Sequence, residues 1–182
     1  MNTDLLPSPA FGRIMLVVSP VSLLDTLFDM VARLALQDSL YVLDGGNSFQ
    51  GYSLACKLRQ STPDVAAPMQ RVMLSRAFTC YQMAALLEEG TFSSRPILVL
   101  DFLSTFYDQG VRVAERRRLL HVCLRRLRAL SQCAPVAVWI RQRSTIPEEG
   151  LQFLEMVQAA AGQVWSPPRH PVLPAAQQLS LF

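Results

Sequence analysis

The chain has 182 residues, 51% of them hydrophobic and 17% charged, which fits one domain with a full core and excludes disorder except at the ends. The longest early apolar run, residues 14–24, contains a proline and two serines and is shorter than the roughly 20 residues needed to span a bilayer. The net charge of +3 is uneven, since residues 1–110 carry −3 and residues 111–182 carry +6. The basic residues are sixteen arginines and Lys57, a bias that phosphate recognition and a GC-rich genome explain equally well.

Strand and helix patterns alternate along the chain. Short apolar runs predict strands at residues 12–18, 40–44, 71–74, 95–101, 135–140 and 163–165. Apolar residues at helical spacing predict helices at residues 22–36, 51–60, 80–89, 113–130 and 148–161, with loops at 62–68 and 102–110. This alternation predicts an α/β fold, with a mainly parallel sheet and helices on both faces. Residues 1–165 should form this core, and residues 166–182, rich in proline at their start, should be a flexible tail.

The apolar run at residues 97–100 is followed directly by Asp101. A run this short and this apolar predicts a strand that is covered on both faces, in the middle of the sheet. An acid at the carboxyl end of such a strand points into the crevice where α/β proteins bind ligands. In P-loop NTPases that acid helps to hold the magnesium ion of a bound nucleotide.

The cysteines indicate a reducing compartment. Cys56, Cys80, Cys123 and Cys133 have no CxxC spacing, so we expect reduced and mostly buried thiols rather than a metal or redox site. The N-terminus has no basic cluster typical of a signal peptide. We therefore expect a cytoplasmic protein without a membrane partner.

Several short segments, in their order along the chain, resemble the ATPase core of the RecA/RadA recombinase family. Residues 42–49 (VLDGGNSF) are similar to the family's second strand and the turn after it, and residues 76–78 (RAF) with Gln82 resemble the turn and helix that follow. The helix after the central strand begins with a basic cluster at 116–118, and the next strand ends near Gln142. The resemblance implies a trimmed RecA-like sheet of the P-loop NTPase type.

The residues that this family uses for catalysis are missing. A phosphate-binding loop needs the pattern G-x-x-x-x-G-K-[ST], but the corresponding residues 19–26 read SPVSLLDT. Both glycines are absent, Pro20 removes a backbone donor, and Asp25 replaces the lysine. The family's water-activating glutamate corresponds to Gly46. We therefore expect no ATPase activity and no bound cofactor, which leaves Asp101 as a strand-end acid that caps a turn.

No other catalytic pattern is present in the sequence. His121 lies within an arginine-rich helix and His170 in the tail, and neither has a partner for a catalytic triad. The sequence contains no G-x-S-x-G and no metal-ligand spacing. These absences predict a protein that binds rather than catalyses.

The helix predicted at residues 113–130 is rich in arginine. It has an apolar stripe, and most of its arginines fall outside that stripe. One interpretation is a surface for the phosphate backbone of DNA; the other is a solvated helix face or a subunit interface with an acidic partner. The candidate DNA-binding residues, with two from the next strand end, are Arg112, Arg116, Arg117, Arg118, Arg125, Arg128, Arg141 and Arg143.

The last five residues, Gln178, Leu179, Ser180, Leu181 and Phe182, are similar to the motif by which bacterial polymerases and repair proteins bind the sliding clamp. The glutamine amide can form hydrogen bonds, while the two leucines and the phenylalanine can fill an apolar groove. The alternative is a tail whose apolar end packs on its own core.

Together these resemblances imply a catalytically inactive RecA-fold accessory protein of DNA repair, recombination or translesion synthesis, associated with the nucleoid and recruited by the clamp. Its expected partners are the bacterial sliding clamp, a translesion polymerase or recombinase subunit, and DNA. It looks similar in kind to ImuA-type partners of translesion polymerases in the bacterial damage (SOS) response. The alternative is a protein-binding RecA-fold regulator such as a SulA-like inhibitor of cell division, which has no need of a clamp motif.

Overall fold

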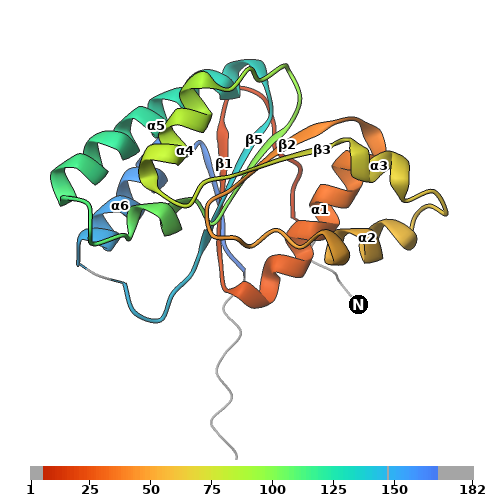
Figure 1. Cartoon of the computed structure of the whole chain (residues 1–182), viewed down its shortest axis with the longest axis horizontal. Coiled ribbons are helices and arrows are strands. Elements are labelled where there is room, and N and C mark those ends of the chain that lie inside the picture. Colours follow the sequence, from red (N-terminus) through yellow and green to blue (C-terminus); the bar gives the residue numbers. More distant parts are fainter. Residues whose placement is uncertain (1–5, 147, 168–182) are drawn as a thin grey trace, which may run out of the picture.

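The computed structural model describes residues 6–146 and 148–167, and it contains a six-stranded sheet in which every strand is parallel to its neighbours (Figure 1). The strand order is β3-β2-β4-β5-β1-β6. The strands are β1 (Ile14–Ser19), β2 (Leu40–Asp44), β3 (Val72–Arg76), β4 (Ile97–Leu100), β5 (Val136–Arg141) and β6 (Gln163–Trp165). The predicted α/β class and parallel sheet are confirmed.

Helices cover both faces of this sheet (Figure 1). One face carries α1 (Leu24–Gln37), α2 (Gly51–Arg59) and α3 (Ala66–Gln70), and the other carries α4 (Cys80–Glu89), α5 (Val113–Cys133) and α6 (Glu148–Ala160). Two short 3₁₀ helices, η1 (Val21–Leu23) and η2 (Phe102–Phe106), follow β1 and β4. Each face therefore has its own apolar core.

The central strand shows why the apolar runs form strands here. All four residues of β4 are buried. Ile97 and Val99 belong to the core beneath α4, α5 and α6, whereas Leu98 and Leu100 belong to the core beneath α1 and α2. Successive side chains of a strand point to opposite faces, so only an uninterrupted apolar run can fill both cores. The prediction that this strand is covered on both faces is confirmed.

Most sequence-based boundaries differ from the structure by one to three residues, and three differences involve a helix or helical turn. The predicted loop 62–68 contains the start of α3, because Asp64 Oδ1 accepts hydrogen bonds from the backbone N–H groups of Ala66 (3.1 Å) and Ala67 (3.3 Å) and starts the turn. The predicted loop 102–110 begins with η2, whose phenylalanine rings are buried. The predicted helix 113–130 continues to Cys133.

Two further sequence expectations bear on the surface of the molecule. Cys80 and Cys123 are buried, but Cys56 is only half-buried and Cys133 is exposed, so burial holds for two of the four thiols. Within residues 6–146 and 148–167, none of the helices combines the length and the apolar character needed to cross a membrane.

Candidate functional site

The carboxyl ends of the central strands meet at one edge of the sheet, where the resemblance would place a nucleotide. β5 lies between β1 and β4, and its last residue Arg141 is paired in register with Ser19 at the end of β1. Asp44 ends β2, and Asp101 follows β4. Both carboxylates are almost fully buried, with 1% of each residue exposed. We refer to Ser19, Asp44, Asp101 and Arg141 as the strand-end cluster.

Asp44 organises the turn that follows β2. Its Oδ1 accepts hydrogen bonds from the backbone N–H groups of Gly46 (3.2 Å) and Ser48 (2.9 Å), and its Oδ2 accepts one from Phe49 (2.9 Å). The Arg76 Nε lies 3.5 Å from Oδ2 and completes the shell of donors. Three backbone donors and an arginine fix the position of this carboxylate. The acid that caps a turn is therefore Asp44, and the expectation that Asp101 has this role is wrong.

Asp101 is held by a different set of contacts. Arg141 Nη2 lies 2.9 Å from Asp101 Oδ2, but its N–H does not point at that oxygen, so the two groups form an ion pair without a hydrogen bond. Burial raises the pKa of the Asp101 carboxyl above its ordinary value, and the nearby charges of Arg141 and Arg143 oppose that effect. The backbone of Asp101 is left-handed (φ 47°), which aspartate tolerates better than most residues.

Gly46 leaves room for the Asp101 side chain. A Cβ atom at position 46 would lie 2.2 Å from Asp101 Oδ2 and 2.6 Å from its Cβ, much closer than non-bonded atoms approach. Position 46 therefore accepts only glycine while Asp101 keeps this conformation. The absence of a side chain at position 46 and the placement of Asp101 are one steric arrangement.

Arg141 and Arg143, predicted to contact DNA, lie at this edge and bind groups within the fold. Arg141 donates a hydrogen bond to Ser48 Oγ (2.7 Å) besides pairing with Asp101. Arg143 donates to Ser104 Oγ (3.0 Å), and its guanidinium lies over the Tyr107 ring, 4.7 Å from the centroid. Both side chains are partly buried and far along the chain from the arginines of α5.

The connection from β1 to α1 also lacks the groups that hold a phosphate. Trp139 Nε1 donates a hydrogen bond to the Oγ of Ser19 (2.8 Å), the last residue of β1. Asp25 accepts a hydrogen bond from Lys57, whose Nζ also lies 2.9 Å from Asp29 Oδ1. The bond to Asp25 is the main reason that the pKa of Lys57 is raised. Lys57 of α2 is thus held by two carboxylates of α1, those of Asp25 and Asp29.

The arginines of α5 fall into distinct environments. Arg116 is only 3% exposed; it donates to the Phe106 carbonyl (3.0 Å), and its Nη2 lies 3.4 Å from Glu149 Oε1. Its guanidinium also lies over the Phe153 ring. Arg116 therefore joins η2, α5 and α6 in this conformation, and its role in DNA binding stays a prediction.

The other arginines predicted on α5 are exposed. Arg112 precedes the first turn, Arg117 donates to Gln152 Oε1, and Arg118 forms a two-pronged pair with Glu115 (2.8 Å for each bond). Arg128 donates to the Ala159 carbonyl (3.0 Å) and the Ala160 carbonyl (3.5 Å) at the C-terminus of α6. A cation at that end stabilises the helix dipole.

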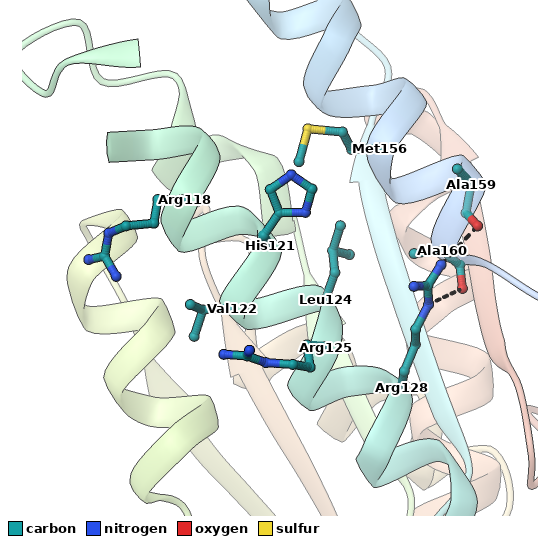
Figure 2. Close-up of a pocket in the computed structure, with 9 residues that line it drawn as sticks. All are labelled: Arg118, His121, Val122, Leu124, Arg125, Arg128, Met156, Ala159 and Ala160. Carbon is teal, nitrogen blue, oxygen red and sulfur yellow. Dashed lines mark hydrogen bonds between the residues drawn. The ribbon is translucent and has the colours of Figure 1, made fainter. Parts of the chain in front are cut away.

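A groove of about 800 Å³ lies over α5 and α6 (Figure 2). Figure 2 shows His121 pointing toward Met156 on α6, while Arg118 and Arg125 extend on the other side of α5. The lining residues are Arg118, His121, Val122, Leu124, Arg125, Arg128, Met156, Ala159 and Ala160. Sequence reasoning identified its three arginines but missed its apolar floor, which requires knowing that α6 packs beside α5.

Two further points concern the predicted clamp-binding motif and possible metal ligands. The motif at residues 178–182, the strongest binding prediction, lies outside the described residues. In the described part of the chain, histidine, cysteine and carboxylate side chains do not gather in groups of three that could hold a metal ion. The strand-end cluster and the α5–α6 groove are two sites that the described residues assemble.

Comparison of the sequence with models of known protein families and with curated proteins finds no match.

Proposed function

We propose that this protein is a non-catalytic RecA-fold accessory factor of DNA repair, recombination or translesion synthesis, recruited to the bacterial sliding clamp through residues 178–182. The proposal has two parts. The first is that the fold no longer handles a nucleotide, and the second is that its role is to bring a partner to the clamp. The two parts depend on different residues and can be tested separately.

The observation that carries the first part is the pairing of Asp101 with Arg141, 2.9 Å apart, in the place where an acid would help to hold a magnesium ion. With Arg141 beside it and Gly46 packed against it, this carboxylate is already occupied within the fold. The β1–α1 connection adds no glycine to curl around phosphates and presents Asp25 in place of a lysine. A triphosphate bound at this connection would be repelled by the Asp25 carboxylate and would lack the attraction that a lysine provides.

The second part is supported by the chemistry of the motif. Leu179, Leu181 and Phe182 together can bury three apolar side chains, each worth roughly 1.5–3 kcal/mol. The cost of ordering the segment offsets much of that. The expected affinity is on the order of micromolar, about −8 kcal/mol, which suits exchange with polymerases that use the same groove.

The test is isothermal titration of the full chain into a purified bacterial sliding clamp. The proposal predicts micromolar binding that is lost when Leu181 and Phe182 are both replaced by alanine. Gln177→Ala, directly before the motif, is the matched control and should leave the affinity unchanged. Equal binding by the parent chain and the double variant would reject clamp recruitment through this motif.

A protein-binding regulator of the SulA-like kind is the second candidate, and the α5–α6 groove favours it because an apolar floor suits a protein surface. The clamp titration separates the two candidates, since such a regulator needs no clamp. Direct DNA binding through the exposed arginines of α5 stays a prediction. Its signature is an affinity that falls with salt, with a slope near −0.9 for each phosphate neutralised.

A further inference from the structure

The outer surface of α5 carries a line of basic residues beside an apolar groove. Arg118, His121, Arg125 and Arg128 follow one another at intervals of three, four and three residues and form a band along the exposed surface of α5. Arg118 and Arg125 lie on the side away from α6, and His121 and Arg128 lie on the side toward it (Figure 2). At 1.5 Å per residue this line is about 15 Å long. It is a continuous feature of the surface rather than a set of scattered charges.

The floor and the far wall of the groove are apolar. Leu124 comes from α5, and Met156, Ala159 and Ala160 come from α6, whereas Val122 lies with Arg118 and Arg125 on the side of α5 away from α6 (Figure 2). The lining residues in the described part of the chain include three arginines and a histidine but no carboxylate. The lining therefore combines a band of arginines and a histidine on α5 with apolar side chains from both helices.

These features distinguish between two anionic partners. A DNA backbone would use the guanidinium groups but gain nothing from Leu124, the Met156 side chain or the alanines. An amphipathic helix with carboxylates on one side and leucines on the other would use both parts of the groove.

We infer that the α5–α6 groove is a docking site for an acidic amphipathic helix of a protein partner. The groove length admits about three helical turns. The carboxylates of the partner would face the Arg118–Arg128 line, with Arg125 as the central contact, and its apolar residues would lie against Leu124 and Met156. This site is separate from residues 178–182, so the protein would have two binding surfaces, and the inference does not depend on clamp binding.

The experiment uses the full chain and three fluorescent probes. The first is a synthetic 16-residue helix with leucines on one face and glutamates beside them, the second has every glutamate replaced by lysine, and the third is a short DNA duplex. Fluorescence anisotropy should show binding of the glutamate peptide and at least tenfold weaker binding of the lysine peptide. Failure of the glutamate peptide to bind at up to about 1 mM would overturn the inference.

Variants then locate the site. Arg125→Glu, at the centre of the line, and Met156→Glu, in the apolar wall, should each weaken the glutamate peptide at least tenfold. Arg59→Glu, the same charge change at the exposed end of α2 on the opposite face of the sheet, should not. Circular dichroism of each variant checks that it folds.

DNA provides the opposite outcome. In that case the duplex binds, Arg125→Glu weakens duplex binding tenfold, and Met156→Gln leaves it unchanged. If the glutamate peptide also fails to compete with the duplex, the groove is a phosphate site and the inference is wrong. If Arg125→Glu and Arg59→Glu lower the peptide affinity equally, only overall charge is being measured, and the inference is wrong as well.

Discussion

Gly46 and Asp101 are in direct steric contact, because a Cβ atom at position 46 would lie 2.2 Å from Asp101 Oδ2 and 2.6 Å from Asp101 Cβ. All of these close contacts are with the side chain of Asp101. Gly46→Ala should therefore lower the free energy of unfolding by about 1–3 kcal/mol, the usual cost of overpacking. In a chain of this size each kcal/mol lowers the melting temperature by roughly 2–4 °C.

A double-mutant cycle checks the cause. Asp101→Gly removes the three atoms nearest to the new Cβ and suits the left-handed backbone at position 101. Gly46→Ala should cost much less in that background, whereas Gly51→Ala, where a Cβ would make only an ordinary contact with Met69 Cε (3.9 Å), should cost little in either. If Gly46→Ala costs the same with and without the Asp101 side chain, the steric explanation is wrong.

The raised pKa of Asp101 predicts how stability depends on pH. The folded protein holds this proton more tightly than the unfolded chain does, because burial disfavours the carboxylate more than Arg141 and Arg143 favour it. Its contribution to stability is fully present below the unfolded pKa, about 3.9, and is lost as the pH rises through the higher folded pKa. Asp101→Asn removes the titration and is tolerated by a left-handed backbone.

We therefore expect Asp101→Asn to become more stable relative to the parent protein as the pH rises from about 3.9 toward neutral. Melting temperatures of both proteins across this range provide the measurement. If the Asp101→Asn protein instead becomes less stable relative to the parent as the pH rises, the charge of Arg141 outweighs burial and the pKa of Asp101 is lowered.

Arg116 and Arg117 are neighbours in sequence with different roles. Removing Arg116 leaves the buried Phe106 carbonyl without its donor and exposes the Phe153 ring, so Arg116→Ala should lower the unfolding free energy by about 1–3 kcal/mol. Arg117→Ala, at an exposed site, should change it by less than about 0.5 kcal/mol. Chemical denaturation of both variants tests this, and equal losses would mean that the basic cluster acts as a unit.

Nucleotide binding should be absent at micromolar ATP. Asp101 is paired with Arg141, and Asp25 with Lys57, so neither the acid nor the lysine is available to magnesium or phosphate. Calorimetry with ATP and Mg²⁺ should give no heat of binding, and no phosphate should be released. Stoichiometric binding that Asp101→Asn abolishes would show that the strand-end cluster can rearrange around a nucleotide.

Strands such as β4 were predictable because a short, uninterrupted apolar run, here Ile97–Leu100, places apolar side chains in the cores on both faces of a sheet. Helix α3 was not, because two prolines, a threonine and an aspartate within residues 62–68 give that segment the composition of a loop. The available signal was Asp64, whose position two and three residues before Ala66 and Ala67 allows it to start a helix.

The candidate sites depend on contacts that no local pattern contains. Arg116 was grouped with its neighbours, although its spacing of four residues before Leu120 places it on the buried side of α5. The pairing of Asp101 with Arg141 requires β5 to lie beside β4, and the α5–α6 groove requires α6 to pack against α5. Strand order and helix packing are decided by the whole chain, so these sites could be found only in the structure.

The most direct test of the account is the affinity of the full chain for a bacterial sliding clamp, measured by calorimetry with and without the double substitution Leu181→Ala/Phe182→Ala. The account predicts a dissociation constant on the order of micromolar for the parent chain, no detectable binding for the double variant, and the same melting temperature for both. It is contradicted if the parent chain does not bind and the double substitution lowers the melting temperature by several degrees, because residues 178–182 would then pack on their own core rather than on a clamp.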